Sequence, residues 1–373
     1  MQPPYYASLT GLRAVAVLMV FLYHYTLVDL GGHGVLGCGW IGVDVFFVLS
    51  GFLITGILAD YRDRSKSLRD FYARRVLRIF PLYYLVLGFA AAYGLLVHAY
   101  FHWLQALWLV DLGNYADYLK PFAPDFQFSL NTLVPRTSTV VVSTGHLWSL
   151  CIEEQFYLLW PFVVYRVRSN KVLLWLAVSV IVAAPLLRLT LYLTAPANML
   201  RDGLLYRILP TRMDALMIGA VLRLLLAGPH RDWIIARRRM LLLLGTAPVA
   251  LFFARAIHRY EDTGFNRLGT FSSSLLFTLV DVAAAVVILN LLDDGAMARA
   301  LRWAPLLWLG EISYGFYLFH ELLRDWLQHL AVELHFSTVS AFTVPIGFAL
   351  TAALAALSFR FVESPFLRLK RYF

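Results

Sequence analysis

Charged residues and cysteines are scarce in this chain. Only 15% of its 373 residues are Asp, Glu, Lys or Arg, whereas 60% are hydrophobic; a soluble domain contains about a quarter charged residues. The two cysteines, Cys38 and Cys151, cannot define a disulfide framework, and neither lies in a metal-like spacing. No polar stretch is long enough to fold around a core of its own. We therefore expect a polytopic membrane protein.

Apolar runs predict about ten membrane-spanning helices, because roughly 20 apolar residues cross a bilayer as a helix. The expected fold is all-α, a transmembrane helical bundle that forms one domain over residues 1–373. A retained first span is expected rather than a cleaved signal peptide, since no basic segment precedes it. The predicted spans cover residues 9–30, 39–59, 81–101, 147–165, 172–193, 208–227, 240–257, 270–292, 304–325 and 339–361.

Basic residues concentrate in the loops that lie on the same side of the membrane as the N-terminus. By the positive-inside rule these loops are cytoplasmic, and so are both termini. The formal net charge of +9 is then explained by cytoplasmic loops beside the bilayer, and no nucleic-acid partner is expected.

The first span carries two ionisable residues, Arg13 and His24. On a helix they lie about 16 Å apart, with Arg13 near the inner end and His24 toward the outer side. Ionisable groups within a span are costly and usually face a cavity or a partner, so both are candidate functional residues. The alternative is structural: Arg13 snorkels to the interface and His24 hydrogen-bonds within the bundle.

Three arginines precede the third span. Arg74 and Arg78 share one face of a helix because they are four residues apart, and Arg75 is their neighbour. Pro81 is expected to open the span as a first-turn residue. Such a cluster can bind phosphate groups bidentately. It can equally anchor the loop against anionic lipid.

The fourth span opens with polar residues. If a helix begins at His146, Glu153 lies two turns deeper on nearly the same face, whereas Glu154 points about 100° away. Glu153 is therefore the favoured site carboxylate, although a structural ion pair with an arginine of another helix explains it as well. In the ninth span, His320 is expected at a depth comparable to that of His24.

Other features are less specific. Ser50 and Gly51 in the second span would let a helix or a ligand approach the backbone. Arg212 and Asp214 are two residues apart and cannot face each other on one helix, so each is expected to pair elsewhere. The segment 113–146 is expected to be an irregular outer loop that can cover a cavity.

Together these polar groups suit group transfer across the membrane. Arginines toward the inner face can hold a phosphate-bearing donor, while histidines toward the outer half can meet an acceptor. Histidine suits general-base work on a hydroxyl because its pKa lies near the operating pH. A nearby carboxylate would orient the imidazole and stabilise its charged form.

Several motifs, in order along the chain, carry a family resemblance: Arg13-x10-His24, FFVLSGFLI (46–54), RDFYARRVLRIFPLYY (69–84), GHLWSLCIEEQFYLLWP (145–161), RMDALMIG (212–219), SYGFYLFH (313–320) and FVESP (361–365). Together they resemble the acyltransferase 3 family of integral membrane O-acyltransferases. Some members carry an esterase-like domain after the last span. The chain ends at Phe373 and resembles the stand-alone form.

The resemblance implies transfer of an acyl group, commonly acetyl, from cytoplasmic acyl-coenzyme A in a bacterial inner membrane. The implied acceptor is a hydroxyl of a surface polysaccharide, a lipid-linked sugar or a related molecule. Neither a permanent cofactor nor a metal is expected, and the oligomeric state stays open. The implied catalytic residues are His24, Arg13 and Glu153. The candidate donor- and substrate-binding residues are Arg74, Arg75, Arg78, His146, Trp148, Ser50, Tyr317 and His320.

Two alternatives stay open. His24 can act as a base on the acceptor hydroxyl, or it can carry the acyl group as a covalent relay. A proton-coupled transporter of a small solute is the competing class, because buried histidine, glutamate and arginine also suit a carrier. A carrier would favour an internal repeat, and none is visible in the sequence.

Overall fold

The computed structural model describes residues 6–31, 33–64, 67–106, 145–194, 204–259, 261 and 272–373, without the side chains of residues 28, 90, 91, 93–106, 272 and 273. Over these residues the chain is almost entirely helical and contains no strand, which confirms the all-α class. The predicted outer loop falls largely outside the described residues, since residues 107–144 are not among them.

The described chain divides into two compact units. Unit 1 comprises residues 1–23, 30–69 and 149–311, and unit 2 comprises residues 24–29, 70–148 and 312–373. Helix α1 (Ala7–Leu30) contributes to both, because its end from His24 to Asp29 belongs to unit 2. The expectation of a single domain over residues 1–373 stays a prediction.

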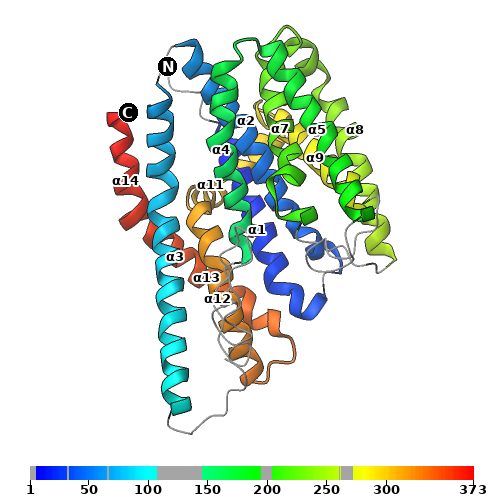
Figure 1. The fold of residues 1–373 in the computed structure, drawn as a ribbon. Helices are drawn as coiled ribbons and strands as arrows, with labels where there is room; N and C mark the ends of the chain where they lie inside the picture. The colour runs from blue at the N-terminus through cyan, green and yellow to red at the C-terminus, as the bar shows by residue number, and fades with distance from the viewer. Residues whose placement is uncertain are drawn as a thin grey trace. The chain divides into compact units, whose positions relative to one another are not determined.

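Unit 1 is built around α7, which packs against α2, α5 and α9 (Figure 1). It also contains most of α4. Its elements are a 3-10 helix (Val35–Trp40), α2 (Ile41–Asp63), α4 (Trp148–Arg166), α5 (Asn170–Thr194), α7 (Leu209–Leu226), α8 (Arg231–His258), a π-helical turn (Ser272–Leu276), α9 (Phe277–Leu291), α10 (Ala296–Leu301) and α11 (Ala304–Glu311).

Helices α2 and α7 approach each other at glycines. A Cβ atom added to Gly51 would overlap the backbone carbonyl of Leu216, and one added to Gly219 would overlap that of Val48. Small residues allow such backbone approach between membrane helices. The prediction that Gly51 admits another helix is therefore confirmed, and that helix is α7.

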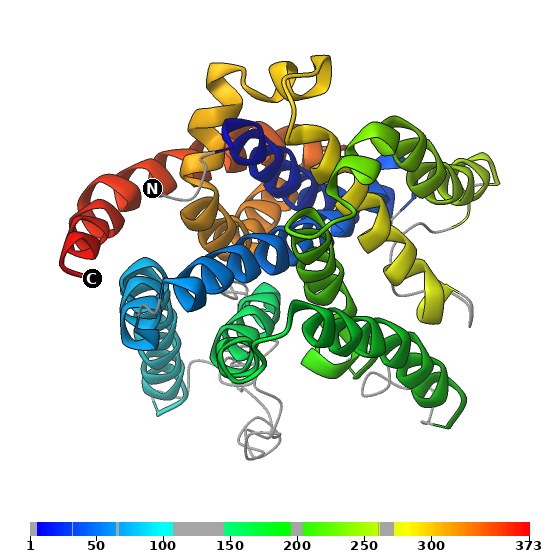
Figure 2. The same ribbon diagram turned by 90° about the horizontal axis from the view of Figure 1, so that it is seen from above.

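Unit 2 pairs α12 with α13 and contains most of α3. Figure 2 shows the same helices from above, and in both ribbon views α14 runs beside the first half of α3. Its elements are α3 (Leu68–Ala106), a 3-10 turn (Gly145–Leu147), α12 (Ser313–Glu333), α13 (Val339–Ser358), a π-helical turn (Phe359–Glu363), α14 (Ser364–Arg368) and a 3-10 turn (Leu369–Tyr372).

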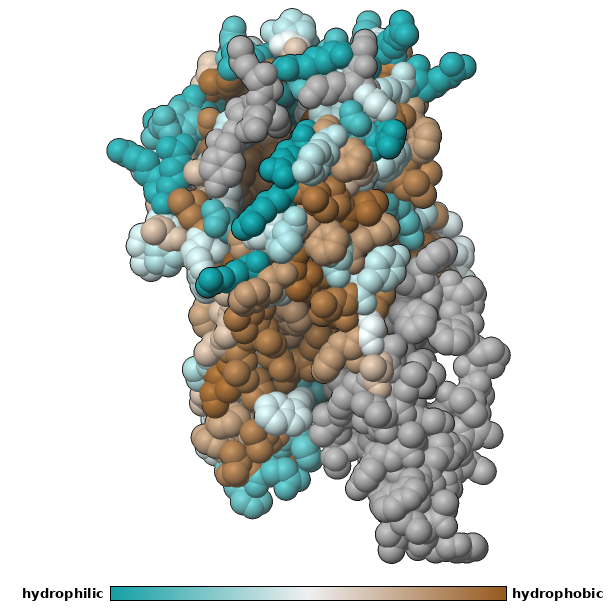
Figure 3. Space-filling view, turned by 90° about the vertical axis from the view of Figure 1, so that its left-hand side faces the viewer, coloured by the Kyte–Doolittle hydropathy of each residue, from teal (hydrophilic) through white to brown (hydrophobic). Residues whose placement is uncertain are grey.

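Six helical segments of the described chain are long and apolar enough to cross a membrane. They match six of the predicted spans, while the count of ten and the orientation of the termini stay predictions. Apolar side chains cover much of the middle of one face, and polar side chains gather above them (Figure 3). The six segments are Ala7–Leu27, Val35–Asp63, Asn170–Thr194, Arg231–His258, Ser274–Leu291 and Val339–Tyr372.

Two predicted helix boundaries were wrong. Pro81 does not open a helix; it lies inside α3, which begins at Leu68. A proline removes a single helical hydrogen bond, and the apolar residues around it continue the helix across that defect. The predicted span 304–325 is broken at Ile312, whose ψ of 3° is not helical and separates α11 from α12. The division between the two units falls at the same point.

Candidate active site

Two histidines from distant parts of the chain meet in unit 2. Nδ1 of His24, near the end of α1, lies 2.9 Å from Nε2 of His320 in α12. The two rings stack with their centroids 5.1 Å apart. The adjacent Tyr25 hydroxyl donates a 2.8 Å hydrogen bond to the backbone carbonyl of His320. The structure therefore brings together two of the predicted site residues, and the side chain next to His24 is bonded to the backbone of His320.

A third histidine and a carboxylate lie beside this pair. The ring of His146 lies 4.9 Å from that of His320, measured between centroids. Nδ1 of His146 lies 2.8 Å from Oε2 of Glu321, and Nε2 donates to the carbonyl of Leu318 at 3.2 Å. Arg324 donates to the other carboxylate oxygen, Oε1 of Glu321, at 3.0 Å. Both oxygens of this carboxylate therefore lie within 3.0 Å of a side-chain nitrogen.

The predicted residue Tyr317 supports the same cluster. Its hydroxyl donates a 2.9 Å hydrogen bond to the backbone carbonyl of His146, so it holds the 3-10 turn against α12. Trp148, which follows this turn, is buried and belongs to unit 2. Tyr317 therefore acts on the position of His146 through the backbone.

The cluster also has the dimensions of a metal site. One ligand atom from each of His24, His320 and Glu321 can be chosen so that all three lie within 4.8 Å of one another. Two imidazoles and a carboxylate are ligands that Zn²⁺ accepts. The close contact between the two rings is also explained by a shared proton. The expectation that no metal takes part stays a prediction.

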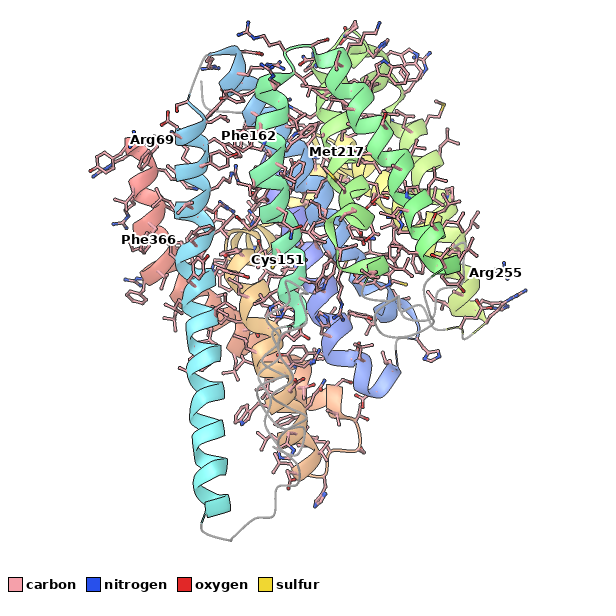
Figure 4. The ribbon with its side chains drawn as sticks, viewed as in Figure 1. Arg69, Cys151, Phe162, Met217, Arg255 and Phe366 are labelled. Carbon is pink, nitrogen blue, oxygen red and sulfur yellow. The ribbon has the colours of Figure 1, made fainter. Side chains whose placement is uncertain are left out.

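Glu153 lies in unit 1, on α4, where its carboxylate has two partners. The Ser50 hydroxyl of α2 donates to Oε1 at 2.7 Å. The Tyr157 hydroxyl lies 3.1 Å from Oε2 and 3.0 Å from the Ser50 oxygen. Figure 4 shows the side chains of α4, with Cys151 labelled in its first turn and Phe162 nearer its other end. The structure thus joins the predicted residues Ser50 and Glu153 directly.

The predicted arginines lie in the first half of α3, in unit 2. Arg74 and Arg78 are four residues apart on a continuous helix, as predicted. Lys370, in the C-terminal 3-10 turn, is close enough to Arg74, Arg75 and Arg78 to feel the charge of all three. Nε of Arg74 is buried and has no hydrogen-bond partner within the described chain. Four cationic groups therefore gather where a polyanionic ligand can bind.

Arg13 is half-buried on α1 and belongs to unit 1. Glu153 belongs to the same unit, whereas His24 and His146 belong to unit 2. The predicted support of His24 by Glu153 therefore stays a prediction. Within unit 2, the carboxylate beside the histidines is Glu321.

Buried ion pairs cross-link unit 1. Arg188 and Asp214, both without exposed surface, form a bidentate pair with separations of 3.1 and 2.7 Å. Arg212 pairs with Asp44, and both of these side chains are also fully buried. The prediction that Arg212 and Asp214 pair elsewhere is confirmed. Arg188 was missed by sequence reasoning, although a lone arginine in the apolar segment 170–194 was the signal for it.

Two residues of the candidate site were also missed. Glu321 directly follows His320, and the acidic residue next to a predicted site histidine was an available signal. Lys370 had no such signal, since only the folding of the C-terminal segment brings it to the arginines of α3.

The apolar helices and the buried histidine–carboxylate cluster define a multi-pass membrane protein with a candidate acid–base site. The acyltransferase 3 family model, described as an acyltransferase domain, matches residues 6–360. The chain therefore belongs to this family, which confirms the resemblance on which the prediction of an acyl-transferring enzyme rests.

Curated relatives support this assignment. The chain is 27% identical over 381 residues to the O-acetyltransferase OatA of Staphylococcus aureus (strain NCTC 8325 / PS 47), covering 97% of this chain and 57% of the relative. It is 28% identical over 375 residues to the peptidoglycan O-acetyltransferase OatA of Listeria monocytogenes, covering 97% of this chain and 56% of that relative. The chain thus spans little more than half the length of these relatives. No solved structure matches it significantly.

Proposed function

We propose that the chain is a membrane O-acyltransferase that moves an acetyl group from cytoplasmic acetyl-coenzyme A to a hydroxyl of a cell-surface glycan. Peptidoglycan is the first acceptor to test, because a relative of similar sequence is named for its acetylation. The proposed location is the inner membrane of a bacterium, with both termini in the cytoplasm. The observation that carries the proposal is the part-buried contact between His24 and His320 in a chain of this family.

In the proposed reaction His24 is the general base. It removes the proton of the acceptor hydroxyl while the hydroxyl oxygen attacks the thioester carbonyl carbon. The carbon–sulfur bond breaks, and the coenzyme A thiolate leaves and is protonated by the imidazolium that has formed. A positioned base of this kind contributes about 10²–10⁴-fold to a rate. Arg13 is proposed to support His24 from the donor side. Glu153 is proposed to be the carboxylate that stabilises the His24 imidazolium.

The donor is proposed to bind by its phosphates at the cationic cluster of unit 2, which consists of Arg74, Arg75, Arg78 and Lys370. Guanidinium groups bind phosphate bidentately and without losing charge at any working pH. The buried Nε of Arg74 supports this role, since a buried donor left without a partner is costly and a bound phosphate oxygen would satisfy it. Each cation that meets a phosphate should contribute to affinity rather than to the chemical step.

The experiment is acetyl transfer by protein reconstituted in nanodiscs. Acetyl-coenzyme A labelled in the acetyl group is supplied with soluble peptidoglycan fragments, and labelled ester is counted for wild type and His24→Gln. The proposal expects ester formation by wild type and a loss of at least about 10²-fold in the variant. No transfer to any hydroxyl acceptor, and no stabilisation of the protein by coenzyme A, would contradict it. A transporter would instead be stabilised by its solute.

A further inference from the structure

We propose that His320 is a positioning residue that keeps a proton on Nδ1 of His24 and thereby leaves the lone pair of His24 on Nε2, ready for the acceptor hydroxyl. This inference rests on the proposed function, in which His24 is the base. It assigns the tautomers of the half-buried His24 and the buried His320 from the hydrogen bonds that the fold imposes on them.

Nδ1 of His320 carries a proton. Its Nδ1 lies 2.6 Å from the backbone carbonyl oxygen of Tyr317, one helical turn earlier in α12. A carbonyl can only accept a hydrogen bond, so Nδ1 of His320 carries a proton. In a neutral imidazole the other nitrogen is then an acceptor, and Nε2 of His320 has its lone pair.

The tautomer of His320 determines the tautomer of His24. Its Nδ1 lies 2.9 Å from Nε2 of His320. Because Nε2 of His320 can only accept, Nδ1 of His24 must donate, and the single remaining lone pair of the neutral His24 ring is on Nε2. The backbone of α12 therefore selects the tautomer of a side chain on α1. The choice follows from hydrogen-bond partners, which is how tautomers are assigned.

His320 is held neutral by its surroundings. Its side chain is 1% exposed, and burying an unpaired charge is costly. The one carboxylate beside it in the cluster, Glu321, is already engaged by His146 and Arg324. A charged His320 would also lie against the ring of His146 at a centroid distance of 4.9 Å. His320 therefore stays neutral, and its Nε2 continues to accept the hydrogen bond from Nδ1 of His24.

The geometry is rigid on both sides of the pair. Tyr25, next to His24, donates from its hydroxyl to the backbone carbonyl of His320 at 2.8 Å. The ring of Tyr25 in turn fills the space over Gly347 of α13, where a Cβ atom would overlap it. Tyr25 therefore ties the end of α1 to α12 and α13 beside the two histidine rings. Such pre-organisation keeps the base in its reactive form before substrate binds.

During transfer, protonation changes at only one atom of the histidine pair, Nε2 of His24. Nε2 of His24 takes the hydroxyl proton as the oxygen attacks the thioester carbon, and the ring becomes an imidazolium whose Nδ1 proton still points at His320. The carbon–sulfur bond breaks, and the Nε2 proton passes to the leaving thiolate. His320 stays neutral throughout and does not change its protonation, just as the histidine-orienting carboxylate of serine hydrolases does not change its own.

Nitrogen NMR tests the tautomer without any substrate. Protein labelled with [15N]histidine is placed in nanodiscs, and the His24 signals are identified by subtracting the spectrum of His24→Gln. The expected spectrum shows a protonated Nδ1 and an unprotonated Nε2 for His24. In His320→Leu the Nδ1 donor loses its acceptor, and a mixture of tautomers is expected. A proton on Nε2 of His24 in the wild-type protein would overturn the inference.

Kinetics separate positioning from simple structural support. His320→Gln keeps a side-chain oxygen that can accept from His24, whereas His320→Leu has a similar size and no acceptor. We expect the leucine variant to lose about 10²-fold in kcat with little change in KM for the donor, and the glutamine variant to retain most of the rate. Equal losses in the two variants, both shown to be folded, would overturn the inference.

The two proposals fail in different ways. If His24→Gln retains full acetyl transfer, the proposed base is wrong whatever the nitrogen spectrum shows. If His24 is required but its proton is on Nε2, the acyltransferase proposal stands and the positioning role of His320 falls.

Discussion

The Ser50 hydroxyl donates a 2.7 Å hydrogen bond to Oε1 of Glu153, and the Tyr157 hydroxyl lies 3.1 Å from Oε2 of the same carboxylate. If Glu153 takes part in transfer, these donors fix its orientation. We expect the double variant S50A/Y157F to lower kcat by about 10-fold or more while coenzyme A binding is retained. Radiolabelled ester formation gives the first value and a thermal-shift titration the second.

A matched control exists on the same pair of helices. Trp160 of α4 donates from Nε1 to Oγ1 of Thr55 of α2 at 2.9 Å, outside the proposed site. T55V leaves the buried Trp160 N–H without its acceptor, so it should cost about 1–3 kcal/mol of stability and leave kcat unchanged. If T55V and S50A/Y157F slow transfer equally, the donors of Glu153 only join helices.

The buried pair between Arg188 and Asp214 predicts a large and partly reversible loss of stability. Arg188→Met leaves a fully buried carboxylate unpaired, at a cost of about 3–5 kcal/mol. The double variant R188M/D214N should recover part of that loss because the unpaired carboxylate charge at position 214 is removed as well. Denaturant-induced unfolding in detergent, followed by tryptophan fluorescence, measures both variants. As a control, R238M breaks a partly exposed ion pair with Asp293 and should cost less than about 1 kcal/mol.

Removing the charge of Lys370 should weaken binding of the donor selectively. Lys370→Met should raise KM for acetyl-coenzyme A several-fold and leave kcat nearly unchanged, because a phosphate contact is made equally before and during the chemical step. The effect should vanish with acetyl-pantetheine, which has no nucleotide phosphates. Arg371→Met is the neighbouring control, since that arginine bonds to the Tyr372 hydroxyl instead. An unchanged KM in the lysine variant would remove Lys370 from the donor site.

The Asp29 carboxylate should contribute to the stability of unit 2 in a pH-dependent way. Desolvation opposes ionisation of its carboxyl, but the Ser340 hydroxyl and the backbone N–H groups of Val339 and Ser340 at the start of α13 hold the pKa of Asp29 below its usual value. A lowered folded pKa adds stability above the unfolded pKa of about 4, and this stability is lost as the pH falls through the folded value.

The corresponding measurement compares wild type with D29N. Since Asp29 is exposed, the difference near pH 7 should be about 1 kcal/mol or less after solvent screening. It should shrink as the pH is lowered below about 4. A stability difference that is independent of pH would show that the charge of Asp29 does not stabilise the start of α13.

Local patterns predicted the helices well, because their signal is a run of apolar residues. Helix class, the close approach at Gly51 and the separate partners of Arg212 and Asp214 all follow from spacing along a helix. The break at Ile312 was missed because residues 304–325 were treated as one apolar run, although Gly310, Glu311 and Ser313 beside it interrupt that run. It coincides with the passage of the chain from one compact unit to the other.

Most residues of the site were predicted from the sequence, but Glu321, Lys370 and the contacts between the site residues were not. His24, His146 and His320 were each singled out as polar groups in apolar segments. That His146 pairs with Glu321, which lies 175 positions away, depends on how the 3-10 turn packs against α12, and no spacing rule reports such a contact. The same holds for Lys370 and the arginines of α3.

A divalent cation offers an independent probe of the histidine cluster. Because ligand atoms of His24, His320 and Glu321 lie within 4.8 Å of one another, added Zn²⁺ should compete with the proton shared by the two histidines and inhibit transfer. EDTA should leave the untreated enzyme fully active and reverse the inhibition. Loss of activity in EDTA, restored by a metal, would instead make the cluster a metal centre.

The most direct test of the proposed function is a single turnover without acceptor. Purified protein in nanodiscs is mixed with less than one equivalent of acetyl-labelled coenzyme A, and free acetate, free coenzyme A and protein-bound label are followed for wild type and His24→Gln. General-base catalysis predicts slow hydrolysis by wild type, no stable label on the protein and loss of hydrolysis in the variant. Label retained on His24 would replace the base with a covalent relay. Equal hydrolysis by both proteins would contradict a role for His24 in acyl transfer.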